Sequence, residues 1–152
     1  MGRIYDAALA WFEDDDWSCD ADPERAVIVV GVKGRNHQWR CVATCSEELE
    51  VFRFYSLLVP EVPGDQRARI GEFLNRANYG LQVGCFEIDY SDGEIRLRTS
   101  VDLEGTTEPA PLIQQVVHAN VSLADRFYPG IMAVLHADVP PVDALERVKA
   151  AQ

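Results

Sequence analysis

Residues 86–99 read FEIDYSDGEIRLRT, and this stretch decides the fold of the chain. Asp92-Gly93 is a strong signal for a two-residue hairpin turn, and the residues on both sides of it alternate in polarity. A two-residue turn pairs apolar residues on one face and opposite charges on the other: Tyr90 with Ile95, Ile88 with Leu97, Phe86 with Thr99, Asp89 with Arg96 and Glu87 with Arg98. The stretch therefore predicts an antiparallel β-hairpin.

Three further strands are predicted upstream of this hairpin. Alternation with a period of two places them at residues 27–32, 37–46 and 49–58. Short turns at residues 34–35 and 47–48 join them into consecutive antiparallel hairpins. With two-residue turns, Cys41 faces Ile28 on one side and Phe54 on the other, so the apolar sets share one face of the sheet.

Helical periodicity predicts the remaining elements. Apolar stripes indicate helices over residues 4–12, between Asp65 and Gly80, and from Pro109 onward. Pro129 is expected to kink or split the last of these helices. The order α-β-β-β-α-β-β-α predicts an α+β fold, in which helices pack on a mainly antiparallel five-stranded sheet.

The 152 residues are expected to form a single domain over residues 1–139, followed by a short C-terminal tail at 140–152 that is helical from residue 142. Within the domain, the first helix and a solvated acidic connector at 13–24 precede a core at 25–137. The connector holds seven acidic residues and no basic one, so it supplies most of the net charge of −11. Acidity of this kind argues against nucleic acid and anionic membrane surfaces as partners.

Nothing in the sequence predicts export or membrane insertion. No apolar signal core follows the first residues. The longest uncharged apolar stretches, such as residues 27–32 and 130–135, are far shorter than the roughly 20 residues of a membrane helix. We therefore expect a cytoplasmic protein without membrane association.

No constellation of residues points to catalysis, a cofactor or a metal. Cys41 and Cys45 are four strand residues apart, about 13 Å, which is too far for a disulfide or for one shared zinc ion. We expect both to be buried as small apolar side chains. Glu87 and Asp89 share a strand face, but the arginines predicted opposite them would make them poor general acids. The sequence therefore predicts a protein without enzymatic activity.

The second face of the three-stranded part is too apolar for a surface open to water. By the register above, it carries six apolar or aromatic residues: Val27, Val29, Val42, Val51, Tyr55 and Leu57. Arg40 and Arg53 dilute this set. Two explanations remain open. A helix of the chain, such as the C-terminal one, covers this face, or another chain covers it, either a second protomer or a segment of a partner protein.

Three motifs resemble those of the YbjN family of bacterial proteins. They are the helical segment FLNRAN at residues 73–78, the hairpin at residues 84–101, and Asp125-Arg126-Phe127-Tyr128-Pro129 with Ile131. The resemblance covers residues 25–137, and Asn75 and Asn78 match the pattern. The family is described as candidate regulators of sensory transduction. The resemblance implies a type III secretion chaperone-like fold and a small non-enzymatic protein that dimerises and holds or regulates another protein.

These observations predict a homodimeric, chaperone-like or regulatory protein that binds a segment of an unidentified partner protein through the apolar face. The alternative is an enzyme or a small-ligand sensor with a pocket between the sheet and the helices. A polar, concave pocket around His118 would favour this alternative, whereas a filled core there would speak against it.

Overall fold

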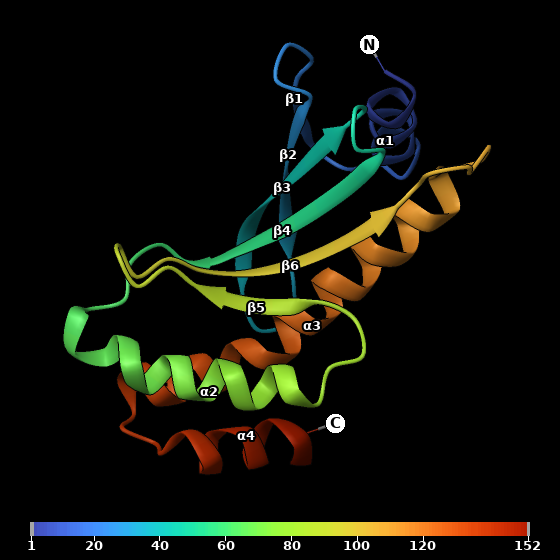
Figure 1. The fold of residues 1–152 in the computed structure, drawn as a ribbon. Helices are drawn as coiled ribbons and strands as arrows, with labels where there is room; N and C mark the ends of the chain where they lie inside the picture. Colours follow the sequence, from blue (N-terminus) through green and yellow to red (C-terminus); the bar gives the residue numbers. More distant parts are fainter. Residues whose placement is uncertain (1, 152) are drawn as a thin grey trace.

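The chain forms an antiparallel sheet with helices packed along one side of it (Figure 1). The computed structural model describes residues 2–151. In chain order the elements are α1 (Arg3–Asp14), β1 (Cys19–Asp22), β2 (Val27–Lys33), β3 (Gln38–Ser46), β4 (Val51–Val59), the 3-10 turn η1 (Gly64–Gln66), α2 (Arg67–Tyr79), β5 (Cys85–Ile88), β6 (Ile95–Asp102), α3 (Ala110–His136) and α4 (Pro141–Ala150). The strands lie in the order β1-β2-β3-β4-β6-β5, and all neighbours are antiparallel.

The α+β fold with an antiparallel sheet is confirmed, but the sheet has six strands and not five. The additional strand is β1, which lies within the segment predicted to be a solvated connector. In β1, Cys19 and Ala21 alternate with two aspartates. Four residues are too few for this periodicity to distinguish a strand from a loop. β1 forms one edge of the sheet, where Asp20 and Asp22 discourage pairing with a further strand.

The loops of the three hairpins are longer than predicted. Each loop has four residues: 34–37, 47–50 and 90–93. The predicted pairs are therefore wrong by two residues, and Cys41 faces Val30 and Ser56 in place of Ile28 and Phe54. Because the side chains of a strand alternate with a period of two, this shift leaves the residues that remain in the strands on their predicted faces.

Asp92-Gly93 correctly marks a turn, although the loop has four residues and not the predicted two. The reason is the conformation and surroundings of Gly93. Its φ of 81° lies in the left-handed region, and a Cβ at this position would come within 2.4 Å of the Val62 carbonyl oxygen. The Val62 N–H donates to the Gly93 carbonyl at 2.9 Å. Glycine is therefore required both by the turn and by the close approach of the segment before α2.

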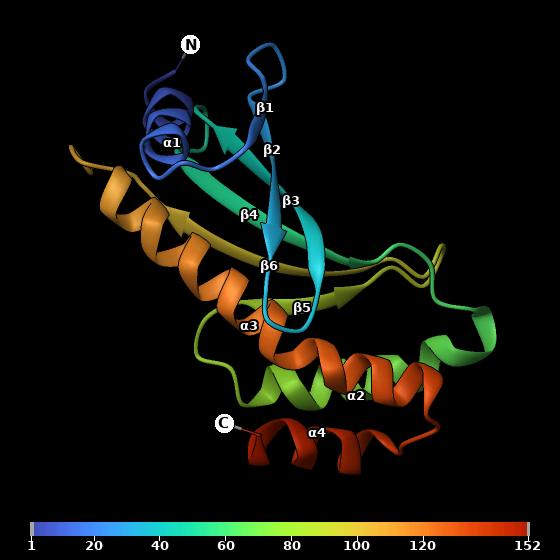
Figure 2. The same ribbon diagram turned by 180° about the vertical axis from the view of Figure 1, so that it is seen from behind.

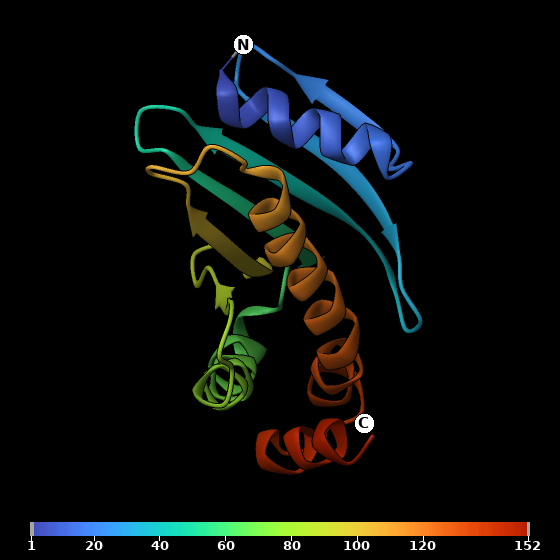
Figure 3. The same ribbon diagram turned by 90° about the vertical axis from the view of Figure 1, so that its right-hand side faces the viewer.

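The helices cover one face of the sheet and extend beyond its β5 edge. α1 and α3 lie across the sheet, and α2 and α4 continue the helical layer past β5 (Figures 2 and 3). Inward side chains fill the space between the layers, and the ring of Phe12 stacks on that of Phe54 with centroids 6.0 Å apart. Among residues 2–151, no helix is long and apolar enough to cross a membrane.

α1 is fastened to the β3–β4 loop at its first turn. The Glu47 carboxylate accepts the N–H groups of Ile4 and Tyr5 at 2.8 and 2.9 Å. It thereby satisfies two donors that a helix N-terminus leaves without a partner. The Arg3 guanidinium also donates to Glu50 of the same loop, at 3.0 Å. The first helix is thus an integral part of the fold.

Residues 140–152, predicted to be a short tail, contain α4. Its Ala144, Leu145 and Val148 are buried in the helical layer, where α4 packs on α2 and α3. Gly130 of α3 permits this close packing, because a Cβ there would lie 2.7 Å from Val148 Cγ2. The boundary at residue 140 stays a prediction, but α4 itself contributes to the core.

α3 is bent but not split (Figures 1 and 2), and Pro129 lies inside this continuous helix. Proline has no N–H, so the carbonyl of Asp125 loses its helical donor. Asn36 Nδ2 donates to this carbonyl at 3.0 Å, and the Asp125 carboxylate accepts the backbone N–H groups of Arg35 and Asn36. The bend is therefore the place where the β2–β3 loop docks on α3.

Candidate interaction surface

The six predicted surface residues lie on the face of the sheet opposite the helices, which we call the open face. The ladder places Val29, Val42 and Tyr55 directly beside one another on β2, β3 and β4. Leu57 follows on the same face of β4 and lies opposite Arg40. Four of the predicted residues thus form one continuous apolar strip.

The other two residues lie at the margins of this strip. Val27 is two positions from Val29 on β2, beside the acidic edge strand β1. Val51 begins β4 and pairs with Ser46 and Asp102, so its neighbours are polar. All six side chains are half-buried, and the sheet brings five of them close together while it leaves Val51 at one end.

The described helices do not cover the open face. α1, α2 and α3 contact the sheet. α1 and α3 lie on one side of it (Figure 3), which is the side of its buried residues. α4, the helix at the C-terminal end of the described chain, packs on α2 and α3. Cover by a helix within residues 2–151 is therefore ruled out as the explanation for the apolar second face.

Arginines border the apolar strip on the β6 side. The Arg96 guanidinium carbon lies 4.5 Å from the centre of the Tyr55 ring, a cation–π distance. Glu87 forms ion pairs with Arg96 at 3.0 Å and with Arg98 at 3.4 Å. The hydrogen bond that Arg98 donates to the Glu87 carboxylate raises the pKa of Arg98. The Tyr55 ring therefore lies beside a network of charged side chains.

Charge is distributed unevenly across the open face. Arg40 and Arg53 lie on its central strands, and neither forms an ion pair with any residue of the described chain. Asp20 and Asp22 lie on the same face at the β1 edge, because they pair with outward-facing valines of β2. The open face thus has a basic, apolar centre and an acidic margin in a chain of net charge −11.

The two carboxylates considered for acid–base chemistry have structural roles. Glu87 is paired with arginine as predicted, although the residue directly opposite is Arg96 and not Arg98. Asp89 does not pair with Arg96 as predicted, because the longer loop moves it out of the strand, where it accepts the hydroxyl and N–H groups of Ser91. These bonds lower the pKa of Asp89, which is the wrong direction for a general acid.

Asn78 closes the β5 edge of the sheet. Its side-chain amide donates to the Phe86 carbonyl at 2.8 Å and accepts the Phe86 N–H at 2.7 Å. These are the main-chain groups that a further strand would use. The family motif therefore contains a residue that protects a sheet edge, whereas its other asparagine, Asn75, is exposed on α2.

A buried hydrogen-bond network joins α3 to the sheet, and our sequence analysis does not predict it. Asn120 Nδ2 donates to the Phe54 carbonyl at 2.9 Å and to Thr99 Oγ1 at 3.2 Å. Its Oδ1 accepts the Ser56 hydroxyl at 2.6 Å, and Trp39 Nε1 donates to Ser56 at 2.8 Å. The sequence does contain a signal, since Ser56, Thr99 and Asn120 are polar residues at positions where the periodicity predicts core.

The space beneath α3 near His118 is filled. His118 is exposed, and its ring contacts that of Trp11 with centroids 5.6 Å apart. The neighbouring side chains that point to the sheet, Val117 and Asn120, are fully buried. This arrangement does not favour a ligand pocket between the sheet and the helices.

The cysteines do not form a reactive or metal-binding group. Cys41 and Cys45 are buried on the helix-covered face, as predicted, and are free thiols. Burial raises the pKa of Cys41 to about 11 and that of Cys45 to about 12, so both remain protonated and unreactive near neutral pH. Within residues 2–151, no three His, Cys, Asp or Glu side chains are grouped as a metal ion would require.

The fold and the open face together define a class: small α+β proteins with an open antiparallel sheet, helices on one side of it, and a type III secretion chaperone-like architecture. A chain of the HopA1–SchA chaperone–effector complex matches with 15% identity and a TM-score of 0.50, over 80% of this chain and 90% of that one. A chain of the ExsC–ExsE complex matches with 11% identity and a TM-score of 0.51, over 83% and 91%. At sequence identities this low, the two matches show a similar fold and nothing more.

A third solved structure leads to the family. YbjN from E. coli, described as "a putative transcription regulator", matches with 12% identity and a TM-score of 0.56, over 87% of this chain and 92% of that one. The model of the YbjN family, described as "Putative bacterial sensory transduction regulator", matches residues 6–132. The chain therefore belongs to the YbjN family, and the resemblance carried by its three motifs is confirmed. No curated protein matches it by sequence.

Proposed function

We propose that the protein is a non-enzymatic interaction module, chaperone-like or regulatory, whose open face binds another polypeptide chain. In the isolated protein this chain is a second copy, which makes a homodimer. In the cell it is a segment of a partner protein. One observation carries the proposal: Val29, Val42, Tyr55 and Leu57 form an apolar strip that no described helix covers.

The charges of the open face support a second copy as an occupant. A two-fold axis places the same surface of both protomers in contact. The acidic margin of one copy, Asp20 and Asp22, then approaches the free arginines Arg40 and Arg53 of the other. Complementary charge of this kind favours association and sets its register.

The solved structures of similar fold support a protein segment as the biological partner. Two of them come from complexes, one titled as a chaperone with its effector. The basic, apolar centre of the open face suits a segment in which apolar residues alternate with acidic ones, because alternate residues of an extended segment point to the same side.

The proposal is tested by adding charge to the strip. Tyr55→Glu and Leu57→Glu each place a carboxylate on the strip, and a bound partner would bury this charge away from water. We therefore expect the self-association constant measured by analytical ultracentrifugation to fall at least tenfold. The fold should tolerate the Tyr55 change, since Arg96 lies beside the new carboxylate. Tyr79→Glu and Leu49→Glu are matched controls, because these side chains are 96% and 60% exposed.

Two outcomes would contradict the proposal. One is a wild-type protein that stays monomeric at millimolar concentration and binds no protein segment. The other is association that survives both open-face changes but is lost in a control variant, which would place the interface elsewhere. Circular dichroism of each variant distinguishes lost association from lost folding.

A further inference from the structure

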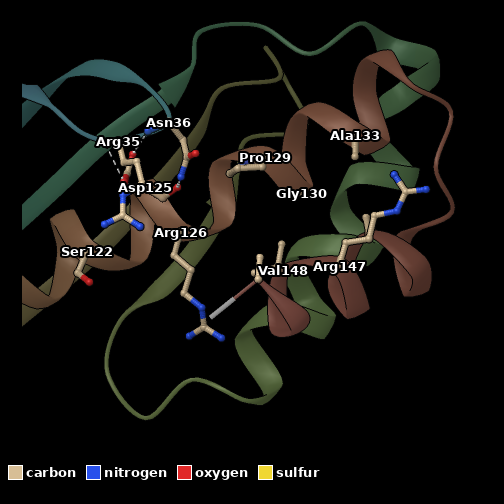
Figure 4. Close-up of a pocket in the computed structure, with 12 residues that line it drawn as sticks. Arg35, Asn36, Ser122, Asp125, Arg126, Pro129, Gly130, Ala133, Arg147 and Val148 are labelled. Carbon is tan, nitrogen blue, oxygen red and sulfur yellow. Dashed lines mark hydrogen bonds between the residues drawn. The ribbon is translucent and has the colours of Figure 1, made fainter.

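A pocket of about 730 Å³ lies where the β2–β3 loop, the bend of α3 and α4 meet (Figure 4). None of the six open-face residues lines it. The pocket is therefore a separate feature of the molecule, and its chemistry is considered on its own.

The lining of the pocket is basic, in contrast to the acidic chain as a whole. Each of the three segments contributes one arginine: Arg35 from the loop, Arg126 from α3 and Arg147 from α4 (Figure 4). None of these arginines forms an ion pair with another residue of the described chain. The one acidic residue in the lining is Asp125, whose carboxylate is already bound by the N–H groups of Arg35 and Asn36.

Arg126 has a donor without an acceptor. Its Nε is shielded from solvent and makes no hydrogen bond, while its guanidinium lies 5.2 Å from the centre of the Phe127 ring. Buried donors in folded proteins are nearly always paired. Because solvent does not reach Nε, a ligand in the pocket would bind the terminal N–H groups of this guanidinium, and arginine binds phosphate through two such parallel groups.

The rest of the lining is small. Between the arginines lie residues such as Ala133 and Ala144, together with the Ser122 hydroxyl, and none of the lining residues is aromatic. The pocket therefore offers no ring on which a nucleobase could stack, and charge dominates its recognition. We propose that it binds a small ligand carrying two or more linked phosphate groups, toward which the side chains of Arg35, Arg126 and Arg147 turn from the separate directions that Figure 4 shows.

Inorganic tripolyphosphate is the probe for this proposal. Calorimetric titration at 150 mM salt should show binding to the wild type that weakens as salt increases. Arg147→Gln should weaken it at least fivefold, and Arg126→Gln with Arg147→Gln at least thirtyfold. Arg147 is exposed on α4, so the single variant should fold normally. Arg76→Gln is the matched control, because Arg76 is a helical arginine paired with Glu72 outside the pocket.

Hydrogen exchange provides a second measurement. A ligand that bridges the three segments should slow amide exchange in α4 and in the β2–β3 loop by at least threefold. No heat of binding and no change in exchange would overturn the proposal. Equal affinity in the wild type and the double variant, or an equal loss in Arg76→Gln, would also overturn it. Association through the open face is measured separately, so failure here leaves that proposal unaffected.

Discussion

Asn120 is a buried amide whose hydrogen bonds are all taken up by the sheet. It donates to the carbonyls of Phe54 and Leu97 on β4 and β6, and it accepts the hydroxyl of Ser56. A buried polar group is stabilising only when its partners are present, because each unpaired donor or acceptor costs about 1–3 kcal/mol. The network therefore fixes the position of α3 on the sheet more specifically than apolar packing does.

We expect Asn120→Ala to lower the free energy of unfolding by about 2–3 kcal/mol, since it leaves a cavity and deprives Ser56 of its acceptor. Urea unfolding followed by circular dichroism measures this change. Asn75→Ala, on the exposed face of α2, is the matched control and should change stability by less than about 0.5 kcal/mol. Equal effects of the two changes would show that the network does not stabilise the fold.

At the scale of elements, the β2–β3 loop and the α3 bend depend on each other. Asn36 Nδ2 replaces the donor that Pro129 removes from the Asp125 carbonyl. A Cβ at Gly34 would lie 2.3 Å from Asp125 Oδ1, so the loop also needs glycine to reach the helix. His37 completes the contact by stacking on Tyr128 with ring centroids 3.8 Å apart.

This dependence predicts a non-additive pair of substitutions. Asn36→Ala should cost about 1 kcal/mol in the wild type, because the Asp125 carbonyl loses its donor. In a Pro129→Ala background the new backbone N–H can bond that carbonyl, so the cost should fall by about 0.5 kcal/mol or more. Urea unfolding of the four proteins measures the coupling energy. Additive effects within about 0.3 kcal/mol would mean that Asn36 does not serve the bend.

The elements themselves were largely predictable from the sequence, and their pairing was not. Apolar periodicity identifies α1, α2, α3 and five strands because core positions repeat with the period of each element. The register depends on loop length, and Asp92-Gly93 marks a turn without stating that four residues form it. β1 was missed because its pairing with β2 depends on main-chain hydrogen bonds, which leave no pattern in four residues.

The residues of the candidate surface could be predicted from the sequence even though the register of the strands could not. A shift of two residues changes the partners of Tyr55 and Val42 but leaves both on the open face. The pocket arginines could not be foreseen, since Arg35, Arg126 and Arg147 are far apart in sequence and line one pocket only because α4 packs on α3. Tertiary contacts of this kind require the fold.

At the scale of the molecule, charge divides the surface into regions with different roles. Residues 13–24 carry seven of the acids, and β1 brings Asp20 and Asp22 to the margin of the open face. The centre of that face and the pocket by α4 hold the free arginines. Of the net charge of −11, residues 13–24 supply −7, and the rest of the chain, which contains both basic sites, carries −4. Each basic site suits an anionic or acidic partner.

The central claim is that another polypeptide chain covers the open face, and photo-crosslinking from position 55 tests it most directly. A benzophenone amino acid in place of Tyr55 should form covalent adducts with a second copy or with a partner protein when cells that naturally produce the protein are irradiated. The same group in place of Tyr79, which is 96% exposed on α2, should form none. Adducts from position 79 with none from position 55 would contradict the account.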